Sequence, residues 1–494
     1  MKNLYRKYPK TVTLIGSLLV IYLLLLIPYE KVQQIQKGSN KPFIWNQDSL
    51  WENLEIEFWE AKRLGCDKIH NRIDSLFYSS DVLLNEISQK PLQPADKKFS
   101  SLEKQLFETA PLIPTCNDRF KDYINFYSRL REVVKEQSRN WDMNSSEAKN
   151  TIYRLLYGNR TAIEEIMLQL PADTIDTLIN GVEEPSQNPS SIMLEVKVHS
   201  GDILVSRGGA PTSALIARGS DYPGNFSHIA LVYIGEIDKN ISIIESHIER
   251  GVVISTLDEY LKDKKLRIMV LRVRQNLITK DPMIPHKAAT YALEGAEANH
   301  IPYDFEMNIN DSEKQFCSEV ASSAYKKFGI NLWAGLSNIS SFGTRNWLSE
   351  FGVKYFQTEE PSDLEYDPQL TVVAEWRDSE TLYKDHLDNA VTDVMLEEAD
   401  SGKVLSYDWY TLPIGRLAKS YSLILNLFGK EGPVPEGMSP EAALKNKKYS
   451  EDHESIKNKL LELAEDFKNQ KGYTPPYWKL IELGREARNE VRNG

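Results

Sequence analysis

Cys317 is the residue whose surroundings in this sequence most clearly suggest covalent chemistry. It lies in residues 315–321 (QFCSEVA), where apolar residues begin to recur at helical spacing. At the start of a helix, a cysteine faces the positive end of the helix dipole and backbone N–H groups that have no partner within the helix. Both favour the thiolate, which attacks carbonyl carbons, and the N–H groups can hold the resulting oxyanion. The competing interpretation is a buried structural cysteine.

A nucleophilic thiol needs a base, and His228 is the leading candidate. It begins the apolar run of residues 227–233 (SHIALVY), and a histidine at the mouth of a strand can face a cleft. Glu245 ends a second apolar run, which the turn at residues 235–240 brings beside the first. A carboxylate there can orient the imidazole through its second nitrogen. The simpler interpretations are a structural histidine and an exposed charge at a strand end.

Two other kinds of site use neighbouring residues. Glu245, His247 and Glu249 alternate on one face of a strand, but ligands from a single strand are too linear to close a metal shell. We therefore expect no metal, and His247 remains a second candidate for orienting the base or binding substrate. Ser227 and Ser318 flank the candidate residues, but the sequence has no Gly-x-Ser-x-Gly motif, which argues against a serine hydrolase. Ser227 is expected on the substrate side of the site.

The candidate residues stand in an order that resembles a known enzyme family. The strings are GDIL at 201–204, SHIALVY at 227–233, IE at 244–245 with GV at 251–252, PYDF at 302–305 and FCSEV at 316–320. This order resembles the circularly permuted branch of the NlpC-type superfamily of papain-like hydrolases, and most of all its YiiX-like members. In that branch the histidine precedes the cysteine, as His228 precedes Cys317 here. The resemblance covers about residues 195–335.

The resemblance implies roles for individual residues. Cys317 matches the nucleophile of the family, His228 its base and Glu245 the polar third residue. Tyr303 and Asp304 match a motif just before the cysteine helix, and we expect both to contribute to substrate binding.

The elements that must position these residues change character near residue 190. Helical spacing of apolar residues runs through residues 48–180, and strand-like runs with short turns follow. Strands are predicted at 192–198, 203–205, 228–234, 241–248, 252–255 and 266–274, helices at 283–299 and 316–328, then a strand at 370–376 and helices at 382–399 and 454–471. The predicted fold class is α+β. A permuted papain-like domain, with an antiparallel sheet or small barrel packed on the cysteine-bearing helix, lies between mainly helical regions.

These elements divide the chain into five segments. They are a cytoplasmic tip and membrane anchor at 1–30, a helical domain at 31–180, a linker at 181–191, the catalytic domain at 192–350 and a mainly helical region at 351–494. Cys66 and Cys116 both lie in the helical domain and can pair, which would leave Cys317 as the unpaired thiol. The alternative for the first two is a pair of small buried apolar residues.

Residues 11–29 are the one stretch suited to membrane attachment. They carry no charge and, at about 1.5 Å per residue, reach roughly 28 Å as a helix, close to the thickness of a bilayer core. Four basic residues precede them, which favours an inside N-terminus and an outside body. We expect a single-pass inner-membrane protein with a periplasmic body. The alternative is a cleaved signal peptide and a periplasmic or secreted protein, although Ile27, Pro28 and Tyr29 make a poor cleavage site.

The composition narrows the class of partner. The formal net charge is -12 and no Lys/Arg-rich block occurs, so nucleic acid is not an expected partner. The leading prediction is hydrolysis of amide bonds through an acyl-thioester on Cys317, without a metal or organic cofactor. Family analogy suggests cell-wall peptides as substrates. The alternatives are a hydrolase or acyltransferase for lipid-derived acyl groups that uses the same Cys-His site, and an inactive binding scaffold.

Overall fold

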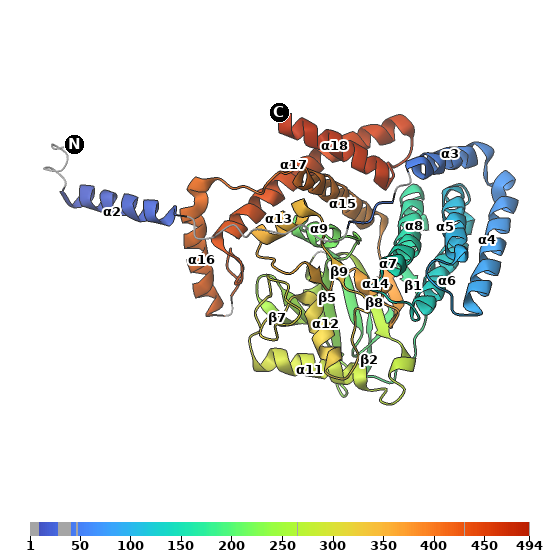
Figure 1. Cartoon of the computed structure of the whole chain (residues 1–494), viewed down its shortest axis with the longest axis horizontal. Coiled ribbons are helices and arrows are strands. Elements are labelled where there is room, and N and C mark those ends of the chain that lie inside the picture. The colour runs from blue at the N-terminus through green and yellow to red at the C-terminus, as the bar shows by residue number, and fades with distance from the viewer. Residues whose placement is uncertain (1–8, 28–40, 46–47, 264, 429, 494) are drawn as a thin grey trace.

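The structure is a computed structural model and describes residues 9–27, 41–45, 48–263, 265–428 and 430–493. An antiparallel sheet of seven strands forms its centre, and helices from both ends of the chain surround the sheet (Figure 1). The helices of residues 48–169 lie to the right of the sheet in this view and the red helices at the C-terminus lie above it, whereas the blue helix nearest the N-terminus projects to the left. The predicted combination of helices and an antiparallel sheet is therefore confirmed.

The sheet is open and has the strand order β1-β11-β8-β4-β5-β6-β7. Neighbouring strands are antiparallel throughout. The edge strands β1 and β7 do not pair with each other, so the described residues do not form the closed small barrel given as an alternative. The strands are β1 Leu178–Asn180, β4 Ile203–Gly208, β5 His228–Ile234, β6 Ile241–His247, β7 Gly251–Thr256, β8 Lys265–Val273 and β11 Leu370–Trp376.

The central strands are covered on both faces, which explains their nearly continuous apolar sequences. Ile203 and Ile229 pack into the core beneath the cysteine-bearing helix. Leu204 and Ala230, one residue further along each strand, belong to a separate core on the other face. Short apolar runs bounded by turn residues are typical of such strands, and this is why β5 and β11 match their predicted ranges to the residue.

Residues 190–199 form a hairpin, whereas the sequence predicted one strand at 192–198. The two arms are β2 Ser190–Met193 and β3 Val196–His199, paired antiparallel. Leu194 and Glu195 turn the chain, and both have positive φ angles of 44° and 69°. This conformation is uncommon for residues other than glycine, asparagine and aspartate, so the turn has no sequence signal. Burial of Met193 and Val198 in the core compensates for it.

The N-terminal region is helical, as predicted, except at its end. Its last predicted helical residues instead form β1, which pairs with β11 from the other end of the chain. Cys66 and Cys116 form a disulfide with an S–S distance of 2.12 Å, and Cys317 is the free cysteine. The helices are α3 Asp48–Leu64, α4 Cys66–Ser88, α5 Lys97–Thr109, α6 Phe120–Ser138, α7 Ser146–Ile152 and α8 Gly158–Gln169.

The remaining helices lie between the strands and after them. Those within the sheet region are α9 Pro211–Arg218, α10 Leu257–Lys262, α11 Ile284–Ala298 and α12 Cys317–Lys326. A short two-stranded ladder, β9 Ser337–Asn338 and β10 Gln357–Thr358, follows. The others are α13 Phe342–Glu350, α14 Asp363–Tyr366, α15 Ser379–Asp400, α16 Leu412–Asn426, α17 Pro440–Lys471 and α18 Tyr477–Asn493.

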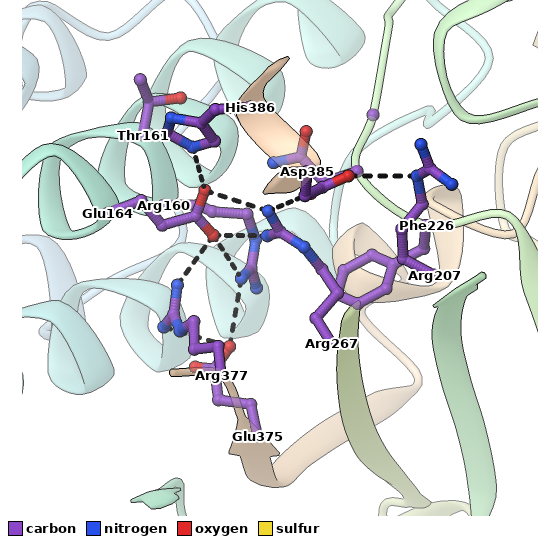
Figure 2. A network of polar contacts seen from close by, with 12 residues as sticks. Arg160, Thr161, Glu164, Arg207, Phe226, Arg267, Glu375, Arg377, Asp385 and His386 are labelled. Carbon is purple, nitrogen blue, oxygen red and sulfur yellow. Dashed lines mark hydrogen bonds and ion pairs between the residues drawn. The ribbon is translucent and has the colours of Figure 1, made fainter. Parts of the chain in front are cut away.

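A buried network of charges joins the N-terminal helices to the sheet and to α15 (Figure 2). Arg160 of α8 lies 3.1 Å from Glu375 of β11. Arg267 of β8 contacts both Glu164 of α8 and Asp385 of α15. These five side chains are almost completely buried, so each charge depends on its partners for solvation. The network ties together segments that the sequence assigned to three different regions.

The predicted membrane segment is described in part. Residues 9–25 form the helix α2, Pro9–Leu25, and residues 28 and 29 lie outside the described residues. Among the helices that the structure describes, none combines the length and the apolar character required to cross a membrane.

Candidate active site

Cys317 is the first residue of α12, at the point where this helix meets the end of β5. The segment before it is held by the backbone N–H of Phe316, which donates a hydrogen bond to Glu319 at 3.0 Å. The side chain of Cys317 is buried, and its Sγ lies 4.0 Å from the carbonyl oxygen of Ser227. The backbone N–H of Ile229 also interacts with the sulfur. The thiol therefore contacts the main chain on both sides of His228.

The environment of Cys317 favours the protonated thiol. Burial raises the pKa of Cys317 to about 11, and the N–H group of Ile229 offsets only part of this effect. The positive end of a helix favours a thiolate, but removing the charge from water costs more here. The effect of burial on the pKa of Cys317 therefore outweighs the effect of its position at a helix start.

His228 and Glu245 form a hydrogen-bonded pair on adjacent strands. His228 Nε2 lies 2.8 Å from Glu245 Oε2, and the other carboxylate oxygen accepts a hydrogen bond from Ser255 at 2.7 Å. His247 Nε2 lies 3.1 Å from the same second oxygen. Because Glu245 engages Nε2, the Nδ1 atom is the imidazole nitrogen left to exchange a proton with a thiol or a leaving group.

Burial and hydrogen bonding set the charges of this pair. Burial lowers the pKa of His228 below its ordinary value, although the hydrogen bond with Glu245 opposes this. Burial alone would raise the pKa of Glu245, but hydrogen bonds from His228 and His247 hold it well below its usual range. Near neutral pH the cluster therefore combines an ionised carboxylate with a neutral imidazole, which is the form that accepts a proton.

The sulfur and the imidazole approach the end of β5 from different faces of the sheet. Ile229 packs in the same core as Cys317. His228 shares the opposite face with Ala230, which pairs with Glu245. The ladder between β5 and β6 begins only at this pair, so the two strands part beside His228. Within the described residues no hydrogen bond links the thiol to the imidazole, although both lie at the same end of β5.

The predicted substrate-binding residues take different positions. Tyr303 lies near the thiol, since burial first and then the proximity of Cys317 raise its pKa. Asp304 is buried, and its two carboxylate oxygens accept hydrogen bonds from the backbone N–H groups of Glu306 and Asn308. Its side chain thus fixes the loop that carries Tyr303. Ser227 presents its carbonyl oxygen to Cys317, at the same strand end.

The possible metal ligands differ from the set considered in the sequence. His228, Glu245 and His247 each offer a ligand atom, and these atoms all lie within 4.8 Å of one another. The set considered in the sequence was Glu245, His247 and Glu249, which alternate along one strand. In the structure the third group is His228 of the neighbouring strand β5, not Glu249. Two strands can supply convergent ligands, which one strand cannot. In the structure, both carboxylate oxygens already serve the imidazole and the Ser255 hydroxyl.

Several residues near the site were not identified from the sequence. Ser255 of β7 binds Glu245, and Ser246 of β6 donates a hydrogen bond to the carbonyl of Gln315 at 2.7 Å, just before α12. Gly437, more than a hundred residues later, packs so closely on Phe305 that a Cβ would lie 2.5 Å from its ring. These contacts depend on register and on distant chain segments, so no local pattern indicates them.

Comparison with known proteins identifies the central part of the chain. Residues 197–374 match the family described as "Permuted papain-like amidase enzyme, YaeF/YiiX, C92 family". No curated protein and no solved structure matches the chain. The match contains Cys317, His228 and Glu245 and extends through most of β11. It confirms the predicted YiiX-like resemblance and the predicted class of enzyme, a papain-like cysteine amidase or peptidase.

Proposed function

We propose that this protein hydrolyses amide bonds through an acyl-thioester on Cys317, with His228 as the base and Glu245 as the residue that orients it. The observation that carries the proposal is the hydrogen bond of 2.8 Å between His228 and Glu245, at the strand end that the Cys317 sulfur contacts. A base with one nitrogen held by a carboxylate, next to a thiol at a helix start, is the arrangement that thiol hydrolysis requires.

The reaction begins with a neutral thiol and a neutral imidazole. His228 Nδ1 takes the proton of Cys317 as the sulfur attacks the substrate carbonyl, and Glu245 stabilises the imidazolium. Catalytic hydrogen bonds are often long or poorly aligned before substrate binds, so the thiol can turn from Ser227 toward the imidazole in the complex. Coupling proton transfer to attack avoids a buried thiolate in the resting enzyme.

Acyl transfer then follows in two stages. The first backbone N–H groups of α12 stabilise the oxyanion that forms on the carbonyl oxygen. As the C–N bond breaks, the imidazolium gives its proton to the leaving amine and the acyl group stays on sulfur. His228 next removes a proton from water, whose oxygen attacks the thioester and releases the acid and the thiol.

We place the body of this protein on the periplasmic side of the inner membrane, attached through residues 11–29, and propose cell-wall peptides as its substrates. The support is the uncharged stretch after four basic residues and the side chains of α2, of which Leu14, Leu18 and Ile21 are more than half exposed. The choice of cell-wall peptides as substrates is supported by the match to an amidase family and by this proposed location.

A variant of the nucleophile tests the activity. Cys317→Ala should abolish release of amines from purified wall fragments while the far-UV circular dichroism spectrum stays unchanged, because alanine has no nucleophilic atom and fits the space. His228→Ala should lower the rate by roughly 10²- to 10⁴-fold through loss of the base. His70→Ala, at an exposed histidine of α4, is the matched control. Full activity of Cys317→Ala would refute the proposal.

Transfer or hydrolysis of lipid acyl groups is the second candidate. Two observations favour it. The helix α16 carries a row of exposed apolar side chains, including Leu417 and Ile424. The loop that follows α16 packs on Phe305, beside the site. Mass spectrometry of the protein after incubation with wall peptides and with phospholipids separates the candidates. An acyl adduct on Cys317 from phospholipid, without any from peptides, would replace the amidase proposal.

A further inference from the structure

We propose that α16 docks on a lipid bilayer, as a second membrane contact beside α2. This inference rests on the membrane attachment proposed above and adds an element that the apolar N-terminal stretch does not include. It also names the surface that positions the active site relative to the membrane.

One face of α16 and its flanking turns carries exposed apolar side chains. Ile414, Leu417, Tyr421, Ile424 and Phe428 follow one another at intervals of three or four residues, so they form a single stripe. Each is more than half exposed, and Phe428 is 74% exposed. Soluble surfaces rarely display a continuous stripe of this kind without a partner.

The opposite face of the same helix is fixed to the protein body. Gly415 packs against Leu444 of α17, where a Cβ would lie 3.1 Å from the leucine side chain. The hydroxyl of Ser422 accepts a hydrogen bond from the backbone N–H of Val434 at 2.9 Å. The helix is therefore held in place by one face, and its exposed stripe is a defined surface.

The exposed apolar stripe of α16 adjoins the apolar helix α2, and this continuity indicates which partner covers the stripe. Tyr22 of α2 donates a hydrogen bond to the carbonyl of Tyr410 at 3.0 Å, and Arg416 donates one to the carbonyl of Ile27 at 2.5 Å. Figure 1 shows α2 projecting away from the body from a point beside α16. Because the two exposed apolar surfaces adjoin, one apolar phase can cover both, and a bilayer is such a phase.

Charge and aromatic residues near the stripe fit the surface of an anionic membrane. Residues 401–430 contain four basic residues (Lys403, Arg416, Lys419, Lys430) and one acidic residue (Asp408), and two of the basic residues pair with carboxylates elsewhere, Lys403 with Glu398 and Arg416 with Glu441. Trp409 and Tyr410, just before the helix, are 67% and 53% exposed. Tryptophan and tyrosine favour the headgroup region, and basic residues are attracted to anionic lipids.

Docking through α16 would place the active site close to the membrane surface. Lys419 of α16 donates hydrogen bonds to the carbonyls of Pro435 and Glu436 in the loop that follows the helix. In that loop, Gly437 packs on Phe305 and on the carbonyl of Tyr303. The docking helix and the tyrosine near Cys317 are thus joined by a short series of direct contacts.

The test uses the full chain with a nitroxide spin label at a single new cysteine, in a Cys317→Ser background that keeps the disulfide. Ile424→Cys places the label on the stripe. Lys447→Cys, at a lysine of α17 whose side chain is 74% exposed, is the matched control. The labelled proteins are reconstituted in vesicles of phosphatidylethanolamine and phosphatidylglycerol, and collisions of the label with oxygen and with a water-soluble nickel chelate are measured.

The inference predicts that vesicles raise the oxygen-to-nickel collision ratio severalfold at position 424 and leave it unchanged at position 447. An unchanged ratio at 424 in protein that floats with the vesicles overturns the docking of α16, while attachment through residues 11–29 stands. Protein that does not float refutes the proposed attachment as well. If the label at 424 is shielded from nickel without gaining oxygen, and electron–electron distances show paired copies, the stripe binds a second copy and the inference fails.

Discussion

At the scale of residues, His228 has one imidazole nitrogen engaged by Glu245 and one left for proton exchange. Burial pushes its pKa down and the pKa of the Cys317 thiol up, so both groups are neutral in the resting state. This differs from a preformed thiolate–imidazolium pair, and the difference can be measured through pH dependence.

We expect the rate of amide hydrolysis to fall as the pH drops through the lowered pKa of His228, because protonation removes the base. The acid limb of kcat/KM should therefore lie below pH 6.5, the ordinary value for histidine. The rate of Cys317 alkylation by iodoacetamide should keep rising with pH until about pH 11, because the thiol ionises only near its raised pKa of about 11. A plateau of the alkylation rate below pH 7 would indicate a resting thiolate and contradict this scheme.

Glu245→Gln should lower kcat by on the order of 10²- to 10⁴-fold with little change in KM, because the imidazolium loses its stabilising charge. The hydrogen bond to Glu245 raises the pKa of His228, so its loss should move the acid limb to still lower pH. Steady-state kinetics across pH measures both effects. Glu236→Gln, at an exposed carboxylate in the turn between β5 and β6, is the control. An unshifted acid limb would exclude the orienting role.

At the scale of elements, the loop that carries Tyr303 depends on the turn between β6 and β7. Gly251 begins β7 with a φ of +71°, and the N–H of the next residue, Val252, donates to the carbonyl of Ile301 at 2.9 Å. A Cβ at Gly251 would lie 2.0 Å from that carbonyl oxygen. Since the obstacle is backbone, a side chain there must displace residues 301–303.

Gly251→Ala should lower both stability and activity. A positive φ costs alanine about 1–2 kcal/mol, and the contact with Ile301 adds to this. Chemical denaturation measures the loss, and peptide hydrolysis should fall because Tyr303 moves. Gly295→Ala in α11, where a Cβ meets no atom within 4 Å, should instead stabilise by about 0.5–1 kcal/mol. Equal effects from the two variants would show that the close approach of Gly251 to Ile301 does not contribute to stability or activity.

At the scale of the whole molecule, the buried charges of Figure 2 connect α8, the sheet and α15. The same parts share apolar packing, because Tyr366 and Leu382 belong to the core of the N-terminal helices. These helices and the catalytic sheet should therefore unfold together.

Arg160→Ala should destabilise the protein by about 3–5 kcal/mol, because Glu365 and Glu375 lose a buried partner. Thermal unfolding followed by circular dichroism and by tryptophan fluorescence should give one lowered transition. Arg139→Ala, which removes a partly exposed pair with Glu136, should change stability by less than about 1 kcal/mol. Two separate transitions in the wild-type protein would contradict this connection between the regions.

The sequence determined the elements whose signals are local. Residues 228–234 are apolar, short and bounded by turns, and they form β5 as predicted. Residues 316–328 have helical spacing, and α12 begins at Cys317. The order of motifs also indicated the permuted papain-like family. Period, turn chemistry and motif order are properties of neighbouring residues, so they can be recognised without a fold.

Only the tertiary structure decided which distant groups meet and how they are charged. It paired Glu245 with His228 and brought Ser255 to the same carboxylate. It joined β1 to β11, set the loop after α16 against Phe305, and buried Cys317 deeply enough to keep its thiol protonated. Contact between remote segments and the loss of solvation arise only when the chain packs, and no spacing along the sequence encodes either quantity.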